Sequence, residues 1–251
     1  GEMVLIDNFI WPFPDEELLG ALDLAVDACV DFVRATGMPF ISGKDSLSST
    51  YRGKDGTVIR IPPVLCVSAF GRLPDVSRTV SADFKEQDSL IVMVGYRNLF
   101  EMAGSVYYEL LGGVGNNLPK IDPGKLMRVL EAVYSAVNSG KLLACHDISE
   151  GGLAAALSEM CFGGGTGARI KIPGGEQAEN FLFNETAGCF LAEIPSGRDP
   201  FDIFREVPVA VVGETTGDGC IVVEKSGQIL CNLDLKELRR SWQQPMKEVF
   251  H

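Results

Sequence analysis

The sequence is poor in the residues that build the commonest metal and nucleophile sites. It has only two histidines, and its seven cysteines are scattered without a CxxC pair. The odd cysteine count and the lack of a signal peptide predict reduced thiols, most of them in the core of a cytoplasmic protein. Basic residues are also few: 22 Lys and Arg against 34 Asp and Glu give a net charge of −12, which argues against a binder of duplex nucleic acid. No apolar run is long enough to cross a bilayer, so we expect no membrane-spanning helix.

The chain has enough apolar sequence to build one large domain or two modest ones. Hydrophobic residues make up 46% and charged residues 22% of the 251 positions. Strands are expected at 4–10, 89–95, 141–149, 189–194, 207–213 and 219–224, a hairpin within 51–73, and helices between Asp15 and Gly37, between Leu126 and Gly140 and over 151–160. Because strands and helices intermix, the predicted class is α/β or α+β. The polar stretch 78–89 is predicted to separate two domains.

The segment SGKDS (42–46) has part of the appearance of a phosphate-binding loop. A Walker A loop needs four residues between its two glycines, but five separate Gly37 from Gly43. Asp45 also stands where the loop needs a hydroxyl for Mg²⁺. We therefore expect no Walker A loop here, and we interpret PFISGKDSL as a strand followed by a loop. Lys44 and Ser46 are weak candidates for phosphate contacts.

The strongest candidate for a site is ACHDISEGGLAAALSEM (144–160). A predicted strand ends in Asp147, Ser149 and Glu150, and two glycines then open a helix. Ligands of open α/β sheets collect at such strand ends, and the glycines would let a phosphate approach the helix N-terminus. Asp147 suits Mg²⁺, which prefers carboxylate and phosphate oxygens. The alternative is that Asp147 and Ser149 only cap the helix.

The remaining polar stretches are ambiguous when each is taken alone. Cys145 and His146 are neighbours on a predicted strand, so their side chains point to opposite faces and cannot act as a dyad. We interpret His146 as structural. Asp7 ends a predicted strand, and Glu185 lies among small residues in FNETAG, where either is equally consistent with a turn or cap. GGVGNN (112–117) lacks dinucleotide-binding spacing and is predicted to be a flexible loop.

Taken together and in order, these pieces resemble one protein family. They are DNF-W-P, PF-SGKDS, IPP-L-VSA-G, AGS-YY, the P-K-D of PKID, A-CHD-S-GGLA-AL-EM and F-NET. The same series runs through the C-terminal half, the second A/B repeat, of phosphoribosylformylglycinamidine synthase, in the aminoimidazole-ribonucleotide-synthetase-like superfamily. The resemblance covers nearly the whole chain, and CHDISEGGLAAALSEM with SGKDS upstream is its specific part.

The resemblance implies a fold and a division into domains. The family enzyme is similar to two fused copies of an A-plus-B unit, in which ferredoxin-like A domains pair into a central barrel with nucleotide sites at the joint. Residues 1–85 would be the remaining part of the second A domain, and 86–251 the second B domain, with α/β mixed sheets in both. The glycine-rich first part of that A domain and the whole first copy would then be absent.

The resemblance also implies roles for residues of the first segment. Asp7 and Gly43 match positions that contact ATP, and Ser46 matches a substrate contact. Lys44 stands where many members have an asparagine that binds Mg²⁺. Because a protonated lysine cannot ligate a metal, Lys44 is expected to supply its own charge to the nucleotide instead.

In the second segment, Asp147 matches a magnesium-binding aspartate and Ser149 a nucleotide contact. Glu185 lies where the first copy holds substrate. Ala187 and Pro119 replace polar residues of that copy, so the resemblance implies a pseudo-symmetric site that binds ATP or ADP for structure. It implies no catalytic residue in this half.

The implied parent reaction is a ligation in purine biosynthesis. ATP phosphorylates the amide oxygen of formylglycinamide ribonucleotide, and ammonia displaces the phosphate to give the amidine, with charge neutralisation and positioning as the main demands. The expected partners are the missing N-terminal half and a glutaminase subunit or domain, and a homodimer through residues 1–85 is a further expectation. The alternatives are another ATP-using member, of the selenophosphate synthetase or thiamine monophosphate kinase type, and a purely structural module.

Overall fold

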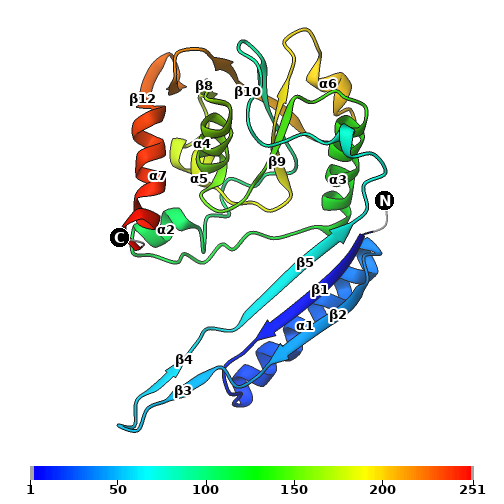
Figure 1. The fold of residues 1–251 in the computed structure, drawn as a ribbon, viewed down its shortest axis with the longest axis vertical. Coiled ribbons are helices and arrows are strands. Elements are labelled where there is room, and N and C mark those ends of the chain that lie inside the picture. The colour runs from blue at the N-terminus through cyan, green and yellow to red at the C-terminus, as the bar shows by residue number, and fades with distance from the viewer. Residues whose placement is uncertain (1–2, 250–251) are drawn as a thin grey trace. The chain divides into compact units, whose positions relative to one another are not determined.

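The computed structural model describes residues 3–249. The chain divides into two compact units, Gly1–Val76 and Ser77–His251 (Figure 1). The predicted division into residues 1–85 and 86–251 stays a proposal about domains. Residues 77–85 belong to the second compact unit. No helix in the described part of the chain is both long and apolar enough to span a membrane.

The first unit is a small sheet with one long helix. Its elements are β1 (Met3–Ile10), α1 (Glu16–Thr36), β2 (Phe40–Ser46), β3 (Thr50–Arg52), β4 (Val58–Arg60) and β5 (Val64–Gly71), and the short 3₁₀ helix η1 (Val76–Arg78) follows. The central strand β1 pairs parallel with β2 and antiparallel with β5. Asp15 caps α1 by accepting the N–H of Leu18 at 3.0 Å, and Gly37 ends it with a φ of 71°. The predicted ends of this helix are therefore confirmed.

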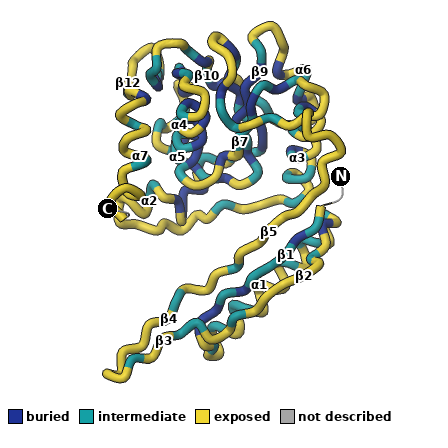
Figure 2. Tube along the Cα trace, in the orientation of Figure 1, coloured by how far each residue is buried: buried dark blue, intermediate teal, exposed yellow. Residues whose placement is uncertain are grey.

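One face of the three-stranded sheet is covered and the other is open. Leu5 and Phe9 of β1 lie four residues apart, so their side chains point to the same face, and both are buried. No residue of α1 itself is buried. On the opposite face, Val64 and Phe70 of β5 are exposed, and Figure 2 shows exposed residues along most of this strand. The helix alone therefore does not complete a core for this unit.

The predicted strand in PFISGKDSL is confirmed, and it includes the whole SGKDS segment. Its residues belong to β2, where Gly43 and Lys44 pair in register with Asp7 and Asn8 of β1. The loop starts only after Ser46. The predicted hairpin is confirmed, because β3 and β4 pair antiparallel around the turn at residues 53–57.

The second unit is built on a seven-stranded mixed sheet of order β12-β11-β8-β10-β6-β9-β7. Its elements are β6 (Leu90–Val94), α2 (Val106–Leu110), α3 (Pro123–Asn138), β7 (Ala144–Ile148), α4 (Gly152–Gly164), β8 (Gly167–Ile172), α5 (Ala178–Phe183), β9 (Cys189–Ile194), α6 (Pro200–Ile203), β10 (Val209–Thr216), β11 (Cys220–Lys225), β12 (Gln228–Asp234) and α7 (Leu235–Val249). Most pairs are antiparallel, but β11 pairs parallel with β8. The predicted α/β class with mixed sheets is confirmed.

Helices cover both faces of this sheet. Leu157 and Met160 of α4 pack with Ile91 of β6 in one buried cluster, and Val129 of α3 packs with Val92 in the other. Neighbouring residues of β6 thus face opposite clusters, as the alternation of side chains along a strand requires. Burial on both faces explains why the central strand β6, LIVMV, is a continuous apolar run.

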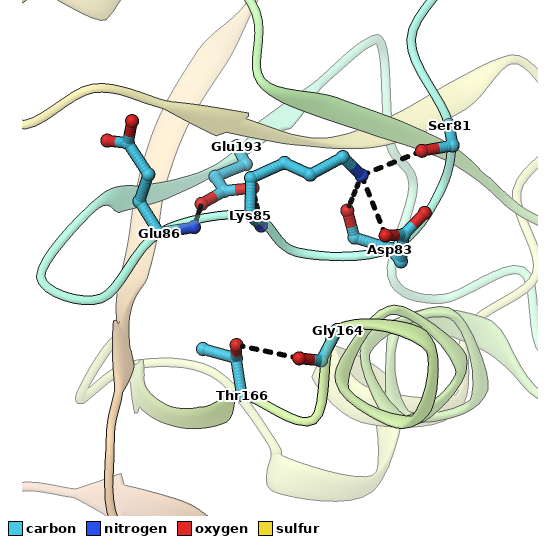
Figure 3. A network of polar contacts seen from close by, with 7 residues as sticks. All are labelled: Ser81, Asp83, Lys85, Glu86, Gly164, Thr166 and Glu193. Carbon is cyan, nitrogen blue, oxygen red and sulfur yellow. Dashed lines mark hydrogen bonds and ion pairs between the residues drawn. The ribbon is translucent and has the colours of Figure 1, made fainter.

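A buried carboxylate fixes the segment that leads into β6 (Figure 3). Glu193 of β9 is 0% exposed and accepts the backbone N–H of Lys85 at 2.8 Å and of Glu86 at 2.9 Å. The Ser89 hydroxyl donates to it at 2.7 Å and also contacts Thr215 of β10 at 2.8 Å. A buried carboxylate is tolerated where hydrogen bonds replace those that it would make with water. For Glu193, the backbone N–H groups of residues 85–86 provide these hydrogen bonds.

The Lys85 side chain points away from Glu193 and contacts residues that precede it in the chain. Its ammonium donates to the Ser81 hydroxyl at 2.7 Å and pairs with the Asp83 carboxylate at 2.9 Å (Figure 3). A hydrogen bond from the Ser81 side chain, followed by the one from Lys85, holds the pKa of Asp83 below its usual value. Residues 81–86 are therefore tied both to each other and to the sheet.

Candidate functional site

The carboxyl end of β7 opens into a cavity of about 350 Å³, here called the Asp147 cavity. Its lining comes from the ends of two segments: Asp147, Ile148, Ser149, Glu150, Glu185, Ala187, Gly188, Cys189 and Phe190. Because β7 pairs antiparallel with β9, residues 147–150 lie beside the turn that precedes β9. Three sequence candidates, Asp147, Ser149 and Glu185, thus line one cavity.

The Glu185 carboxylate makes hydrogen bonds that the sequence did not suggest. It accepts the N–H of Gly151 at 2.8 Å and the N–H of Val106 at 3.0 Å. It therefore joins the start of α4 to the start of α2. The amide of Gly151, which we expected to be open to a phosphate, already has an internal acceptor.

The glycine pair at the start of α4 also has a packing role. A Cβ on Gly152 would lie 2.7 Å from the carbonyl oxygen of Leu182 and 2.8 Å from Cα of Phe183. The expected room for a ligand at this residue is thus occupied by backbone from α5. The alternative that Asp147 and Ser149 cap α4 is wrong, because no side chain caps this helix.

His146 and Cys145 lie as predicted on opposite sides of β7. The His146 ring contacts Glu159 of α4 at 2.9 Å and the Asp147 carboxylate at 3.2 Å, whereas Cys145 packs in the cluster of α3. Burial, with a smaller effect of Asp147, raises the pKa of the Cys145 thiol to about 12. The prediction that the two residues form no dyad is confirmed, and both nitrogens of the His146 ring contact carboxylates.

The metal prediction rests on Asp147 alone. Although Asp147, Glu150 and Glu185 line the same cavity, no group of three or more His, Cys, Asp or Glu within residues 3–249 is placed to hold a metal ion. The Asp147 side chain is 60% exposed. It is a hard oxygen donor that suits Mg²⁺, so the other ligands would have to come from water and nucleotide phosphates.

In the first unit the predicted contacts divide between the two faces of the sheet. Asp7 lies over Gly43. Burial is the largest cause that raises the pKa of the Cys29 thiol in α1, and the charge of Asp7 is the second. Both residues are therefore on the face toward the helix. Lys44 and Ser46 are hydrogen-bonded to each other on the opposite, open face.

A residue that the sequence did not single out lies beside Lys44. Asn8 pairs in register with Lys44 on the open face, and its Oδ1 is the one buried side-chain polar atom of residues 3–249 for which no hydrogen-bond partner is found. A buried acceptor without a donor is costly and marks a position for water or a ligand. The alternation along β1 could have pointed to Asn8, because it places Asn8 rather than Asp7 with Lys44 and Ser46.

A larger cavity of about 610 Å³, the Tyr96 cavity, lies in the second unit. It is lined by Met93, Gly95, Tyr96, Arg97, Asn98, Glu101, Lys120, Ile121, Asp122, Lys125, Leu126, Val129, Thr186, Ala187, Gly188 and Pro208. The Lys125 ammonium lies 5.2 Å from the centre of the Tyr96 ring. Ala187 and Gly188 line both cavities, so the FNETAG segment forms the wall between them.

The architecture is that of an AIR-synthase-like protein. The structure of Thermotoga maritima PurL complexed with ATP is similar with a TM-score of 0.70 and 16% identity, over 94% of this chain and 38% of that one. Escherichia coli HypE is similar with a TM-score of 0.67 and 16% identity, over 92% of this chain and 73% of that one. At these identities the likeness establishes the fold.

The sequence comparison identifies the family. Residues 86–225 match the family described as AIR synthase related protein, C-terminal domain, and the chain belongs to it. Curated relatives include phosphoribosylformylglycinamidine synthase subunits PurL of Thermoplasma acidophilum, 30% identical over 91% of this chain, and of Caldanaerobacter subterraneus, 32% identical over 84%. The chain spans 29% and 28% of the length of these two relatives. The predicted resemblance to the C-terminal half of this enzyme is confirmed.

Proposed function

We propose that this chain is the nucleotide-binding second half of a phosphoribosylformylglycinamidine synthase. The observation that carries the proposal is that Asp147, Ser149 and Glu185 of the family motifs line one cavity at the end of β7. Similarity to PurL subunits at about 30% identity across most of the chain supports it, as does the likeness to PurL structures with ATP, ADP and AMPPCP.

The residues of the chain would bind and orient the nucleotide. Asp147 would offer a carboxylate ligand to Mg²⁺, which neutralises phosphate charge when bound. Lys44 would bring a second positive charge and Ser149 a hydroxyl donor. With three carboxylates and no basic side chain in its lining, the Asp147 cavity repels a bare phosphate. A bound cation is therefore a requirement for nucleotide binding there.

In the first unit, Asp7 and Gly43 would contact the nucleotide and Ser46 the substrate. Asp7 and Gly43 lie on the face toward α1, whereas Lys44 and Ser46 share the open face, so the proposed contacts come from both faces of the sheet. Glutaminase chemistry needs an activated cysteine, and burial raises the pKa of Cys145, Cys161 and Cys189. A glutaminase partner and the other half of the enzyme would supply ammonia and the catalytic residues, and the similarity to the PurLQS structure supports partner subunits.

Two measurements test this proposal. The isolated chain, given formylglycinamide ribonucleotide, ATP and ammonia, is expected to form no product, and turnover would contradict the assignment as an inactive half. In a parent enzyme that contains the chain, Asp147→Ala should weaken Mg-ATP binding at the second nucleotide site, as measured by calorimetry. Glu159→Gln, on the other side of His146, is the matched control. Equal affinity in both variants would leave Asp147 without a ligand role and favour the purely structural alternative.

A further inference from the structure

Residues 98–121 form a loop whose hydrogen bonds to the rest of the second unit run through one short motif. Among the residues that the structure describes, the hydrogen bonds that join this loop to the rest of its unit all end on Asn184, Glu185 or Thr186. The Asn184 amide donates to the carbonyls of Asn98 and Glu101 at 2.9 Å each. Thr186 Oγ1 accepts the N–H of Asn98 at 3.3 Å, and Glu185 accepts that of Val106.

The motif itself is rigidly held. Asn184 is 0% exposed, and its Oδ1 accepts from Arg97 at 3.1 Å and from the Thr186 hydroxyl at 2.7 Å. Beside it, the Tyr107 ring of the loop stacks on Phe183 with centroids 4.8 Å apart. Leu99 of the loop also packs against the core that contains α4, and Met102 is buried. The hydrogen-bonded part of the attachment is therefore small, and its geometry is well defined.

The loop is also held together internally. Gly104 donates its N–H to the Val114 carbonyl at 2.7 Å, and Ala103 donates to Asn117 at 3.1 Å. The Asn117 amide donates to the carbonyl of Phe100 at 2.8 Å. Internal bonds of this kind make the loop a compact piece rather than a set of independent residues.

The outer surface of the loop is strongly apolar. Its exposed large side chains are Phe100, Val106, Leu110, Leu111, Val114, Leu118 and Ile121, with Leu110 81% exposed. The two ends of the loop, at residues 98–101 and 120–121, line the Tyr96 cavity. A change in the attachment of the loop would therefore change both an apolar surface and a cavity wall.

Glu185 connects this attachment to the other cavity. Its carboxylate lines the Asp147 cavity and binds the N–H groups of both Gly151 and Val106. Asn184 and Thr186 have their polar groups occupied inside the protein, whereas Glu185 is only partly buried. Of the three residues, Glu185 is the one that lines the Asp147 cavity.

We propose that residues 184–186 are a clasp for loop 98–121 and that Glu185 couples the clasp to the Asp147 cavity. A group in that cavity that donates hydrogen bonds, such as an ammonium, would compete for the Glu185 carboxylate. Val106 would then lose its acceptor, and the α2 end of the loop would detach while Asn184 still holds residues 98–101. This device does not depend on the proposed function, since it needs only a donor group in the cavity.

The clasp is tested by hydrogen exchange of the full chain in three variants. Glu185→Ala should speed exchange of the Val106 amide by roughly tenfold or more, because a charge-assisted hydrogen bond is lost. Glu185→Gln should have a smaller effect, since its amide oxygen still accepts. Glu150→Gln, in the same cavity, should leave Val106 unchanged, and residues 220–234 should stay protected in all three. Unchanged exchange at Val106 in Glu185→Ala, or equal acceleration in residues 220–234, would overturn the proposal.

The coupling to the cavity has its own test at Ala187, which lines the cavity two positions from Glu185. Ala187→Lys places an ammonium beside the Glu185 carboxylate, and Ala187→Met places an uncharged chain of similar length there. Faster exchange at Val106 in the lysine variant than in the methionine variant is expected. Equal exchange in the two variants would overturn the coupling, even if the Glu185 variants support the clasp.

Discussion

The carboxylate of Asp7 occupies the space above Gly43, so that a Cβ on Gly43 would lie 2.2 Å from its Oδ1. The two residues pair in register on β1 and β2. Any side chain at residue 43 would therefore displace Asp7 from its present position between the sheet and α1. Glycine at this position is explained by the aspartate and needs no phosphate.

The first prediction follows from this contact. Gly43→Ala should destabilise the first unit by about 1–3 kcal/mol, as overpacking in a well-packed site does. Its control is Gly20→Ala in α1, where no atom lies within 4 Å of the added Cβ. That variant should gain roughly 0.5–1 kcal/mol from helix propensity. Denaturant unfolding followed for the first unit checks both, and a stabilised Gly43→Ala would show that Asp7 moves without cost.

The second prediction concerns the buried carboxylate of Glu193. Glu193→Gln should lower the free energy of unfolding by about 1–3 kcal/mol, because an amide group would turn a donor toward the N–H groups of Lys85 or Glu86. The control is Glu206→Gln, which is exposed in the same unit and should stay within about 0.5 kcal/mol of the parent. Equal urea midpoints for the two variants would mean that Glu193 is not needed to fix residues 85–86.

The third prediction is a loss of stability at alkaline pH. Burial raises the pKa of the thiols of Cys145 and Cys161 to about 12 and that of Cys189 to about 11. Unfolded cysteine ionises near ~8.5, so above that pH the unfolded chain releases protons that the folded chain keeps. The contribution of these thiols to the free energy of unfolding should therefore be constant below that pH and fall as the pH rises toward about 11.

Arg97 acts in the opposite direction, but at higher pH. Burial lowers its pKa to about 10, so above that value the unfolded chain holds the extra proton. Denaturant midpoints between pH 8 and 10 therefore report mainly on the thiols. Cys189→Ala should show a shallower pH dependence than the parent, and an identical slope would mean that Cys189 ionises normally when folded.

The fourth prediction is self-association through the open face of the first unit. Val64 and Phe70 are exposed there, 41% and 53% respectively, beside unpaired strand edges of β2 and β5. The isolated chain should form a dimer in sedimentation, and Phe70→Lys should abolish it. Phe201→Lys, at a residue 58% exposed in the second unit, is the matched control and should leave the dimer intact. A strict monomer at high concentration would contradict the prediction.

Local signals in the sequence predicted the elements that have strong ends or strong periodicity. Asp15 and Gly37 bracket α1, and the apolar run 89–95 contains β6, because caps and buried strands leave a short-range pattern. The strands β8 and β12 were missed. ARIKI alternates polar and apolar residues, which is a strand pattern that could have been recognised in the sequence. QILCNLD has no clear period, and its pairing with β11 decides that it is a strand.

The candidate site was predictable in its members but not in their contacts. Asp147, Ser149 and Glu185 were all named, and they line one cavity. That Glu185 binds Gly151 and Val106 depends on contacts across 34 and 79 positions, which no local pattern encodes. The placement of Asp7 and Lys44 on opposite faces could have been predicted from the sequence, because it follows from the alternation of side chains along two paired strands.

The strand order of the second unit has a consequence during synthesis on the ribosome. Both neighbours of β8 in the sheet, β10 and β11, lie downstream of it in the chain. At ~5–20 residues per second, β8 waits for some seconds with both of its edges unpaired before residue 209 emerges. Nascent chains that stall in this interval expose a template for intermolecular pairing, so they should depend on chaperones more than the finished protein does.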